Sequence, residues 1–154
     1  MKILKKLKPY KVDTLLFGLD RNSSMDFQEL LPLDYPVFFE KKDSLYKILE
    51  RETLVHKSKI FHKSMLLNAF GFKGPMILIG DCFTHDGYRG KGIYPAVLRH
   101  ILKEFIPKNN VYILVSPENI PSIRGIEKAG LRLIGRLRCL RIGPVFFKKK
   151  ILNN

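Results

Sequence analysis

The chain has 154 residues, of which 45% are hydrophobic, and these values are typical of one folded domain rather than of a disordered segment. Its 28 lysines and arginines against 14 acidic residues give a net charge of +14. This charge predicts an anionic partner but does not choose among nucleic acid, a membrane surface and phosphate-bearing small molecules. No apolar run reaches the roughly 18 residues of a membrane span, and the charged N-terminus does not resemble a signal peptide. The two cysteines, Cys82 and Cys139, suit a reducing compartment, so we expect a cytoplasmic protein.

The first half of the chain is expected to form mainly strands. Residues 12–19 fit either a strand or a short helix. Asp43 and Ser44 are suitable caps for a short helix that ends at Leu49. Residues 35–41 are rich in aromatic and β-branched residues and are predicted to be a strand. Residues 54–58 and 60–68 are expected to form two further strands.

The second half alternates strands and helices. The apolar run at 75–84 fits a buried strand, and residues 93–105 place apolar side chains on one helix face. Residues 111–116 then predict a strand that is covered on both faces. Because strand, helix and strand make a βαβ unit, these two strands should be parallel. A second helix at 120–129 and an antiparallel pair at 136–139 and 143–147 complete a mixed α/β sheet.

A glycine loop, Tyr88 to Pro95 (YRGKGIYP), lies between the first of these strands and its helix. Gly90 and Gly92 permit close approach of a ligand, and a helix N-terminus presents free N–H groups and a positive dipole end, a combination that binds phosphate. A turn that simply requires glycine explains the same spacing, so the loop alone leaves both interpretations open. The sequence has no P-loop motif, and Pro95 stands where a dinucleotide fingerprint has its third glycine.

Two segments together resemble the GNAT superfamily of N-acetyltransferases. Arg89 and Gly92 match the first and fourth positions of its coenzyme A loop, Arg/Gln-x-x-Gly-x-Gly/Ala, whereas Tyr94 replaces the small sixth residue. One strand later, NIPSIRGIEKAGL (119–131) is similar to the family's N-x-x-[AS]…EK-x-G-F segment, with Leu131 in place of Phe. The resemblance covers residues 77–131. It implies a GNAT-like mixed sheet with central splayed parallel strands flanked by helices, in a single domain.

The resemblance also implies the cofactor and the reaction. Acetyl-coenzyme A would be the acetyl donor, no metal is expected, and a primary amine of a small molecule would attack directly in a ternary complex. The wider combination of motifs resembles acetyltransferases of bacterial surface-polysaccharide gene clusters, which implies an amino sugar as acceptor, free or nucleotide-linked. A backbone N–H near the end of the strand would polarise the thioester carbonyl. The implied cofactor-binding residues are Phe83, Thr84, Arg89, Gly90, Lys91, Gly92, Ile93, Tyr94, Asn119 and Ser122.

The acid and base of the family do not transfer to this chain. The usual proton-donating tyrosine corresponds to Ile126, and the strand positions that often carry a base fall at Leu78 and Gly80. His56 is the remaining catalytic candidate, because histidine titrates near neutrality, although a lone histidine in a strand is more often structural. Cys82 would act as a nucleophile only with a neighbouring base.

Two alternatives stay open from the sequence. The charge also fits a basic nucleic-acid-binding module, although no nucleic-acid motif is present and the acidic residues are interspersed. Ile126 in place of the tyrosine fits a GNAT-fold protein that binds the cofactor without catalysing transfer. The expected partner is therefore a small-molecule amine, with nucleic acid not favoured, no membrane span, and a homodimer left open.

Overall fold

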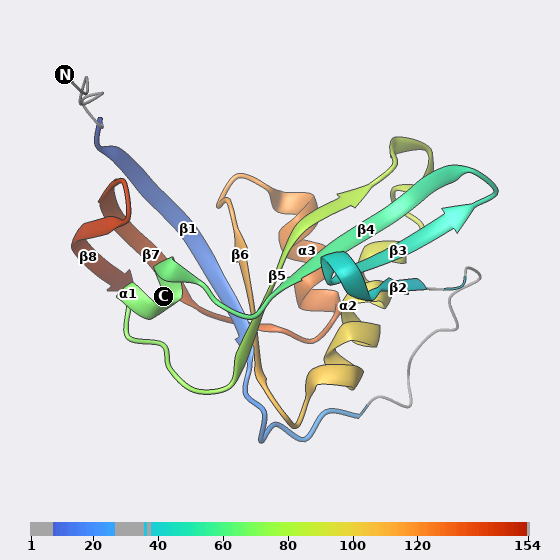
Figure 1. Ribbon diagram of the computed structural model, residues 1–154, viewed down its shortest axis with the longest axis horizontal. Helices are drawn as coiled ribbons and strands as arrows, with labels where there is room; N and C mark the ends of the chain where they lie inside the picture. The colour runs from blue at the N-terminus through green and yellow to red at the C-terminus, as the bar shows by residue number, and fades with distance from the viewer. Residues whose placement is uncertain (1–7, 27–35, 37, 154) are drawn as a thin grey trace.

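The computed structural model describes residues 8–26, 36 and 38–153, which are organised around one twisted eight-stranded sheet (Figure 1). The strands are β1 (Tyr10–Leu19), β2 (Phe38–Glu40), β3 (Leu45–Glu50), β4 (Thr53–Phe61), β5 (Met76–Thr84), β6 (Asn110–Val115), β7 (Arg132–Ile142) and β8 (Val145–Leu152). The α-helices are α1 (Met65–Ala69), α2 (Ile93–Phe105) and α3 (Ile120–Lys128), and two 3₁₀ helices span Lys41–Asp43 and Asp86–Tyr88. Within the described ranges, no helix is long and apolar enough to cross a membrane.

The strand order is β2-β3-β4-β5-β6-β1-β7-β8, and only the central pair β5–β6 is parallel. Helix α2 connects these two strands, as a crossover between parallel neighbours requires. This is the mixed α/β architecture with central parallel strands that the sequence predicts.

The helices cover the two faces of the sheet unequally. Helices α2 and α3 lie side by side on one face (Figure 1), where α2 buries Val97 and Ile101 against sheet residues such as Phe17. The short helix α1 packs with Leu67 against the opposite face, which Leu16 reaches from the same strand as Phe17. Successive residues of a strand point to opposite faces, so β1 contributes to both cores.

The central strands separate partway along their length. Parallel pairing runs from Met76 opposite Asn110 to Ile79 opposite Ile113 and then stops. Beyond this point β5 continues to Thr84 with β4 as its partner, while β6 continues with β1. The two strands thus diverge toward the N-termini of α2 and α3.

A β-bulge in β5 changes which side chains face the helices. Asp81 has a left-handed backbone with φ of 47°, and the register with β4 shifts between Gly80 and Phe83. Before the bulge, the buried residues Ile77 and Ile79 point into the core under α2 and α3. After it, even-numbered residues face this side, because the inserted residue shifts the alternation by one position.

Several predicted elements agree with the structure. Residues 12–19 form a strand, the predicted strands at 75–84 and 111–116 correspond to β5 and β6, and the helices at 93–105 and 120–129 correspond to α2 and α3. The antiparallel closing pair is also present as β7 and β8. Only Phe38–Glu40 of the predicted strand at 35–41 forms a strand, and residues 35 and 37 lie outside the described part.

Two predictions in the first half are wrong. Residues 44–49 form no helix: Ser44 takes a left-handed turn with φ of 51°, and Tyr46 and Ile48 alternate into the core as residues of β3. The predicted strand at 60–68 ends at Phe61, because Ser64 begins a helix by accepting a hydrogen bond from the N–H of Leu67 at 3.2 Å. The two predicted strands at 54–58 and 60–68 are therefore one strand, β4, followed by α1.

Candidate functional site

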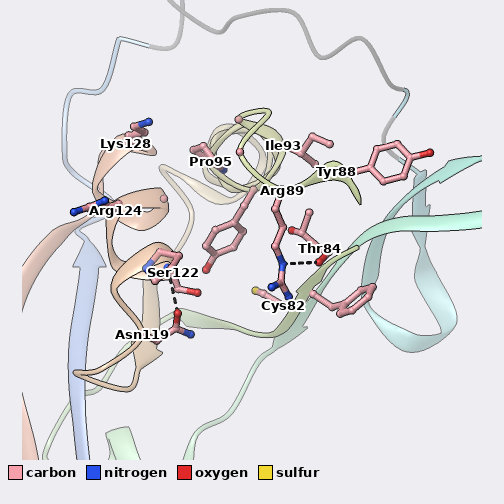
Figure 2. Close-up of a pocket in the computed structure, with 16 residues that line it drawn as sticks. Cys82, Thr84, Tyr88, Arg89, Ile93, Pro95, Asn119, Ser122, Arg124 and Lys128 are labelled. Carbon is pink, nitrogen blue, oxygen red and sulfur yellow. Dashed lines mark hydrogen bonds between the residues drawn. The ribbon is translucent and has the colours of Figure 1, made fainter. Parts of the chain in front are cut away.

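A pocket of about 540 Å³ lies where β5 and β6 diverge, between the end of β5, the glycine loop and α3 (Figure 2). The residues that line it are Cys82, Phe83, Thr84, Tyr88, Arg89, Gly90, Gly92, Ile93, Tyr94, Pro95, Asn119, Pro121, Ser122, Arg124, Gly125 and Lys128.

The glycine loop has the backbone conformation that only glycine adopts readily. Gly90 and Gly92 have φ of 76° and 73°, and Gly92 is the N-cap of α2. A Cβ atom at either position would meet no heavy atom within 4 Å, so space inside the protein does not explain these glycines. The first N–H groups of a helix have no partner within the helix, and here they lie at the pocket wall. The loop therefore presents bare backbone to whatever occupies the pocket.

Arg89 connects the glycine loop to the end of β5. Its Nε donates a hydrogen bond to the Thr84 carbonyl oxygen at 3.2 Å, and Figure 2 shows the side chain reaching to that strand. The guanidinium also forms an ion pair with Asp86 at 3.0 Å. Both partners of the pair are exposed, and such pairs contribute little to stability. The arrangement mainly holds a cation at the pocket.

Helix α3 forms the opposite wall. The Asn119 side chain caps it by accepting a hydrogen bond from the Ser122 N–H at 3.3 Å (Figure 2). Arg124 and Lys128 lie four residues apart, on neighbouring turns of the same helix face. Together with Arg89 they give the pocket three cationic side chains, and no carboxylate is among its described lining residues. This balance favours an anionic ligand.

Tyr94 and Gly125 fit together across the two helices. A Cβ built on Gly125 would lie 2.7 Å from Cδ1 of Tyr94, which is closer than side chains approach. Glycine in the middle of a helix is destabilising by roughly 0.5–1 kcal/mol relative to alanine, so a residue of this kind inside α3 calls for a structural reason. The tyrosine ring supplies it, because the ring occupies the space of the missing side chain.

A buried chain of polar groups lies behind the pocket. His56 is fully buried, its Nδ1 lies 2.8 Å from Thr84 Oγ1, and its Nε2 lies 2.8 Å from Ser58 Oγ. The Ser58 hydroxyl in turn donates to the sulfur of Cys82 at 3.3 Å. Since that hydroxyl donates onward, Nε2 carries the proton of the histidine and Nδ1 accepts from Thr84. Burial lowers the pKa of His56 to about 4, so the ring is neutral at neutral pH.

The chain continues to Tyr94. The thiol of Cys82 interacts with the hydroxyl of Tyr94, and the ring centroid of Tyr94 lies 5.8 Å from that of His56. Burial raises the pKa of the Cys82 thiol, although the residue forms part of the exposed pocket wall. Burial, with a further contribution from Cys82, also raises the pKa of Tyr94. At neutral pH the sulfur is therefore a thiol rather than a thiolate nucleophile.

Comparison with known proteins identifies the fold. No protein-family model and no curated protein sequence matches the chain. Among solved structures, it is similar to an acetyltransferase from the GNAT family from Colwellia psychrerythraea, with a TM-score of 0.58 and 13% sequence identity. The chain has a GNAT-like fold. The match covers 92% of this chain and 57% of the other, so the chain spans little more than half the length of that protein.

Within this GNAT-like fold, the predicted cofactor residues gather around one pocket with a single exception. Lys91 does not line the pocket; its Nζ lies 5.0 Å from the ring centroid of Tyr88 instead. His56, the predicted catalytic residue, is also not a lining residue, because it is buried beneath Thr84 and Tyr94. Its contact with the pocket is therefore indirect.

Sequence reasoning missed several residues of the pocket wall. Pro121, Arg124, Gly125 and Lys128 line it from α3. Their helical spacing of three to four residues is a signal that was available, because it places all of them on the helix face next to Ser122. Tyr88 and Pro95 lie at the two ends of the glycine loop, and their positions depend on how that loop folds.

The fit between Tyr94 and Gly125 predicts a context-dependent effect on stability. We expect Gly125→Ala to lower the free energy of unfolding by about 1–3 kcal/mol, because the new methyl group overlaps the tyrosine ring. In a Tyr94→Ala background, Gly125→Ala should instead raise the free energy of unfolding by roughly 0.5–1 kcal/mol, because alanine has the higher helix propensity and no ring is in the way. Urea unfolding of the four proteins measures both effects, and equal effects in the two backgrounds would contradict this packing.

The buried histidine predicts a loss of stability in acid. The pKa of His56 is about 4 when folded against an ordinary 6.5, so below the ordinary value the unfolded chain binds the proton first. The folded state is therefore destabilised relative to the unfolded state as the pH falls from about 6.5 toward 4, whereas above about pH 6.5 the ring is neutral in both states and has no such effect. Between about pH 7.5 and pH 5 we expect the loss to be on the order of 2 kcal/mol. The His56→Gln variant keeps uncharged hydrogen-bonding groups and should lose less stability over the same pH interval, as measured by urea unfolding. If the variant and the wild-type protein show the same pH dependence, titration of His56 is not the cause of the acid sensitivity.

Proposed function

We propose that this protein is an N-acetyltransferase that moves an acetyl group from acetyl-coenzyme A to a primary amine of a small molecule. The observation that carries the proposal is the left-handed glycine loop at the N-terminus of α2, which lies where β5 and β6 diverge in a GNAT-like fold. The cationic character of the pocket supports the same reading.

The residues present fit coenzyme A in chemical type. The N–H groups of Gly92, Ile93 and Tyr94 at the start of α2 would bind the pyrophosphate, whereas Pro95 has no N–H to contribute. Arg89, together with the two cations of α3, would neutralise the remaining phosphate charge. The part of β5 beyond its pairing with β6 has backbone groups on that side with no strand partner. These groups would receive the amides of the pantetheine arm as an added strand edge.

The chain's own contribution to transfer is orientation and polarisation. Acetyl-coenzyme A supplies the activated thioester when it is bound. A backbone N–H at the end of β5, near Phe83, would stabilise the negative charge that develops on the carbonyl oxygen during attack by the amine. Holding the amine against the carbonyl supplies a further large part of the rate enhancement. No lining residue is required to form a covalent bond.

For the acceptor, we propose an amine on a sugar, with nucleotide-linked amino sugars as the first class to test. The pocket and its surroundings carry net positive charge, which suits an acceptor that bears phosphates. A pocket of about 540 Å³ is also of the size at which small molecules bind, which favours this reading over nucleic-acid binding.

Cofactor binding tests the proposal directly. Calorimetric titration with acetyl-coenzyme A should give saturable binding, and Gly92→Glu should lower the affinity at least about tenfold, because it adds strain and a negative charge at the helix N-terminus. Gly71→Glu is the matched control: Gly71 also has a positive φ, of 86°, with no heavy atom within 4 Å of a built Cβ, but lies outside the pocket. Wild-type protein that does not bind acetyl-coenzyme A at millimolar concentration would refute the proposal.

Turnover separates an enzyme from a silent binder. A panel of amine acceptors that includes nucleotide-linked amino sugars should contain at least one that accelerates thiol release from acetyl-coenzyme A. The acetylated product should appear in equal amount by mass spectrometry, because transfer makes one amide for each thiol released. Binding of the cofactor without thiol release for any acceptor would favour the non-catalytic alternative instead.

A further inference from the structure

A row of four side chains crosses the arm of the sheet formed by β2, β3, β4 and β5. Lys57 of β4 lies directly opposite Lys47 of β3 on one side and opposite Phe83 of β5 on the other. Lys47 in turn lies opposite Phe38 of β2. Side chains that are directly opposite on neighbouring strands share a face. His56, the neighbour of Lys57 along β4, is buried beneath α2, so alternation places the row on the other face of the sheet.

The described helices pack elsewhere and leave this face open. Helix α2 packs against the opposite face of the arm, where Tyr46, Ile48 and Val55 are buried in the same core. Helix α1 belongs to the core at the other end of the sheet, and Figure 1 shows it beside β7 and β8, away from β3 and β4. The row is therefore a surface available to a ligand.

Two lysines of this face carry charge that no described carboxylate balances. Lys47 forms an ion pair with Glu40, whereas Lys57 and Lys59 form none within the described ranges. Lys59 lies two residues from Lys57 on the same face, and its Nζ is 5.5 Å from the ring centroid of Phe61. Like charges directly opposite on neighbouring strands, as in Lys47 and Lys57, are destabilising. An anion between Lys57 and Lys59 would relieve this repulsion.

The two ends of the row are exposed aromatic rings. Phe38 is 53% exposed and Phe83 is 40% exposed. Such rings are platforms on which nucleobases stack. Phe83 also lines the pocket, so this end of the row reaches the place where β5 and β6 diverge. Three strand spacings of about 4.8 Å separate the two rings, roughly 14 Å in all, which suits a ligand of several parts.

We propose that this face binds the acceptor as an amino sugar linked to a nucleotide diphosphate. The base stacks on Phe38, the diphosphate lies between Lys57 and Lys59, and the sugar lies against Phe83 with its amine directed into the gap between β5 and β6. The inference rests on the proposed acetyl transfer. The order of groups in this ligand, base, diphosphate and sugar, matches the order aromatic ring, cation and aromatic ring along the row. The diphosphate carries two negative charges, one for each of the two lysines.

A second copy of this chain fits the same face less well. Each copy would bring the same lysines and the same net charge of +14 to the contact, and like charges repel. Charge complementarity therefore favours the anionic small molecule.

The first test measures anion binding and needs no active acceptor. Coenzyme A is added to saturation to occupy the glycine loop, and uridine diphosphate is then titrated by calorimetry; stacking accepts any base, so this nucleotide serves as the probe. Wild-type protein should bind it, and Lys57→Gln should lower the affinity about tenfold, the size expected of one charge-assisted contact. Lys150→Gln is the matched control and should leave the affinity unchanged, because Lys150 also lies opposite a cation, Arg138, but in the other arm of the sheet.

A second substitution separates the base from the diphosphate. Phe38→Ala should lower the affinity for uridine diphosphate about tenfold, the size of a lost stacking contact, and should not change that for inorganic pyrophosphate, which has no base. Lys57→Gln should lower both affinities. Equal loss of both affinities in Phe38→Ala would show damage to the strand arm and would overturn the assigned role of Phe38.

The third test measures turnover. With a nucleotide-linked amino sugar as acceptor, Lys57→Gln should raise the KM of that acceptor about tenfold and leave kcat and the KM of acetyl-coenzyme A unchanged. With the free amino sugar, which lacks the diphosphate, the same substitution should leave kcat/KM unchanged. Equal losses with both acceptors would show that Lys57 does not bind the diphosphate.

The remaining outcomes separate this inference from the proposed function. If coenzyme A-saturated wild-type protein does not bind uridine diphosphate at millimolar concentration, or if Lys150→Gln weakens binding as much as Lys57→Gln, the inference is overturned and the acetyltransferase proposal stays intact. A dimer that Lys57→Gln dissociates, seen by sedimentation velocity, also overturns it, because a second copy would then cover the face. If wild-type protein binds neither coenzyme A nor acetyl-coenzyme A, the proposed function fails and the inference fails with it.

Discussion

The early end of the pairing between β5 and β6 is the constraint on which the site depends. After Ile79 and Ile113, each strand keeps only its antiparallel partner, and the sheet divides into two arms. An unpaired strand edge inside a protein leaves backbone groups that need partners. The pocket lies along this edge, and its other walls come from the helices that follow the two strands. The same separation brings the N-terminus of α2 near that of α3.

The bulge at Asp81 determines which chemistry faces this pocket. By simple alternation from Ile77 and Ile79, the residues facing the helices would be Asp81 and Phe83. The left-handed residue shifts the alternation, and Cys82 and Thr84 face the helices instead. A carboxylate is thereby kept out of a cationic pocket, and a thiol and a hydroxyl take its place. One backbone irregularity thus decides the charge of the site.

The sequence predicts the elements whose signals are local, and the cases where it fails involve long-range geometry. The apolar periodicity of α2 and the continuous apolar run of β6 suffice for those elements, and two motifs in the order strand, loop, helix and strand indicate the fold. Asp43 and Ser44 have the residue types of a helix cap, but the residues that follow them form β3, which pairs with β4. No local signal marks the bulge at Asp81. The burial of His56 behind Tyr94 likewise depends on the packing of α2 against β4, which sequence spacing does not contain.

The complementary sizes of Tyr94 and Gly125 have a consequence for how such a site changes over generations. The Tyr94 ring on α2 occupies the space that a side chain at position 125 of α3 would need. A chain that exchanges one residue at a time must pass through an intermediate that is either overcrowded or hollow between the helices, and both are penalised. The two positions therefore form an epistatic pair. If an ancestor had a small residue at position 94, Gly125 would have had to arise before Tyr94 or together with it. A substitution at one of the two positions therefore depends on the residue at the other.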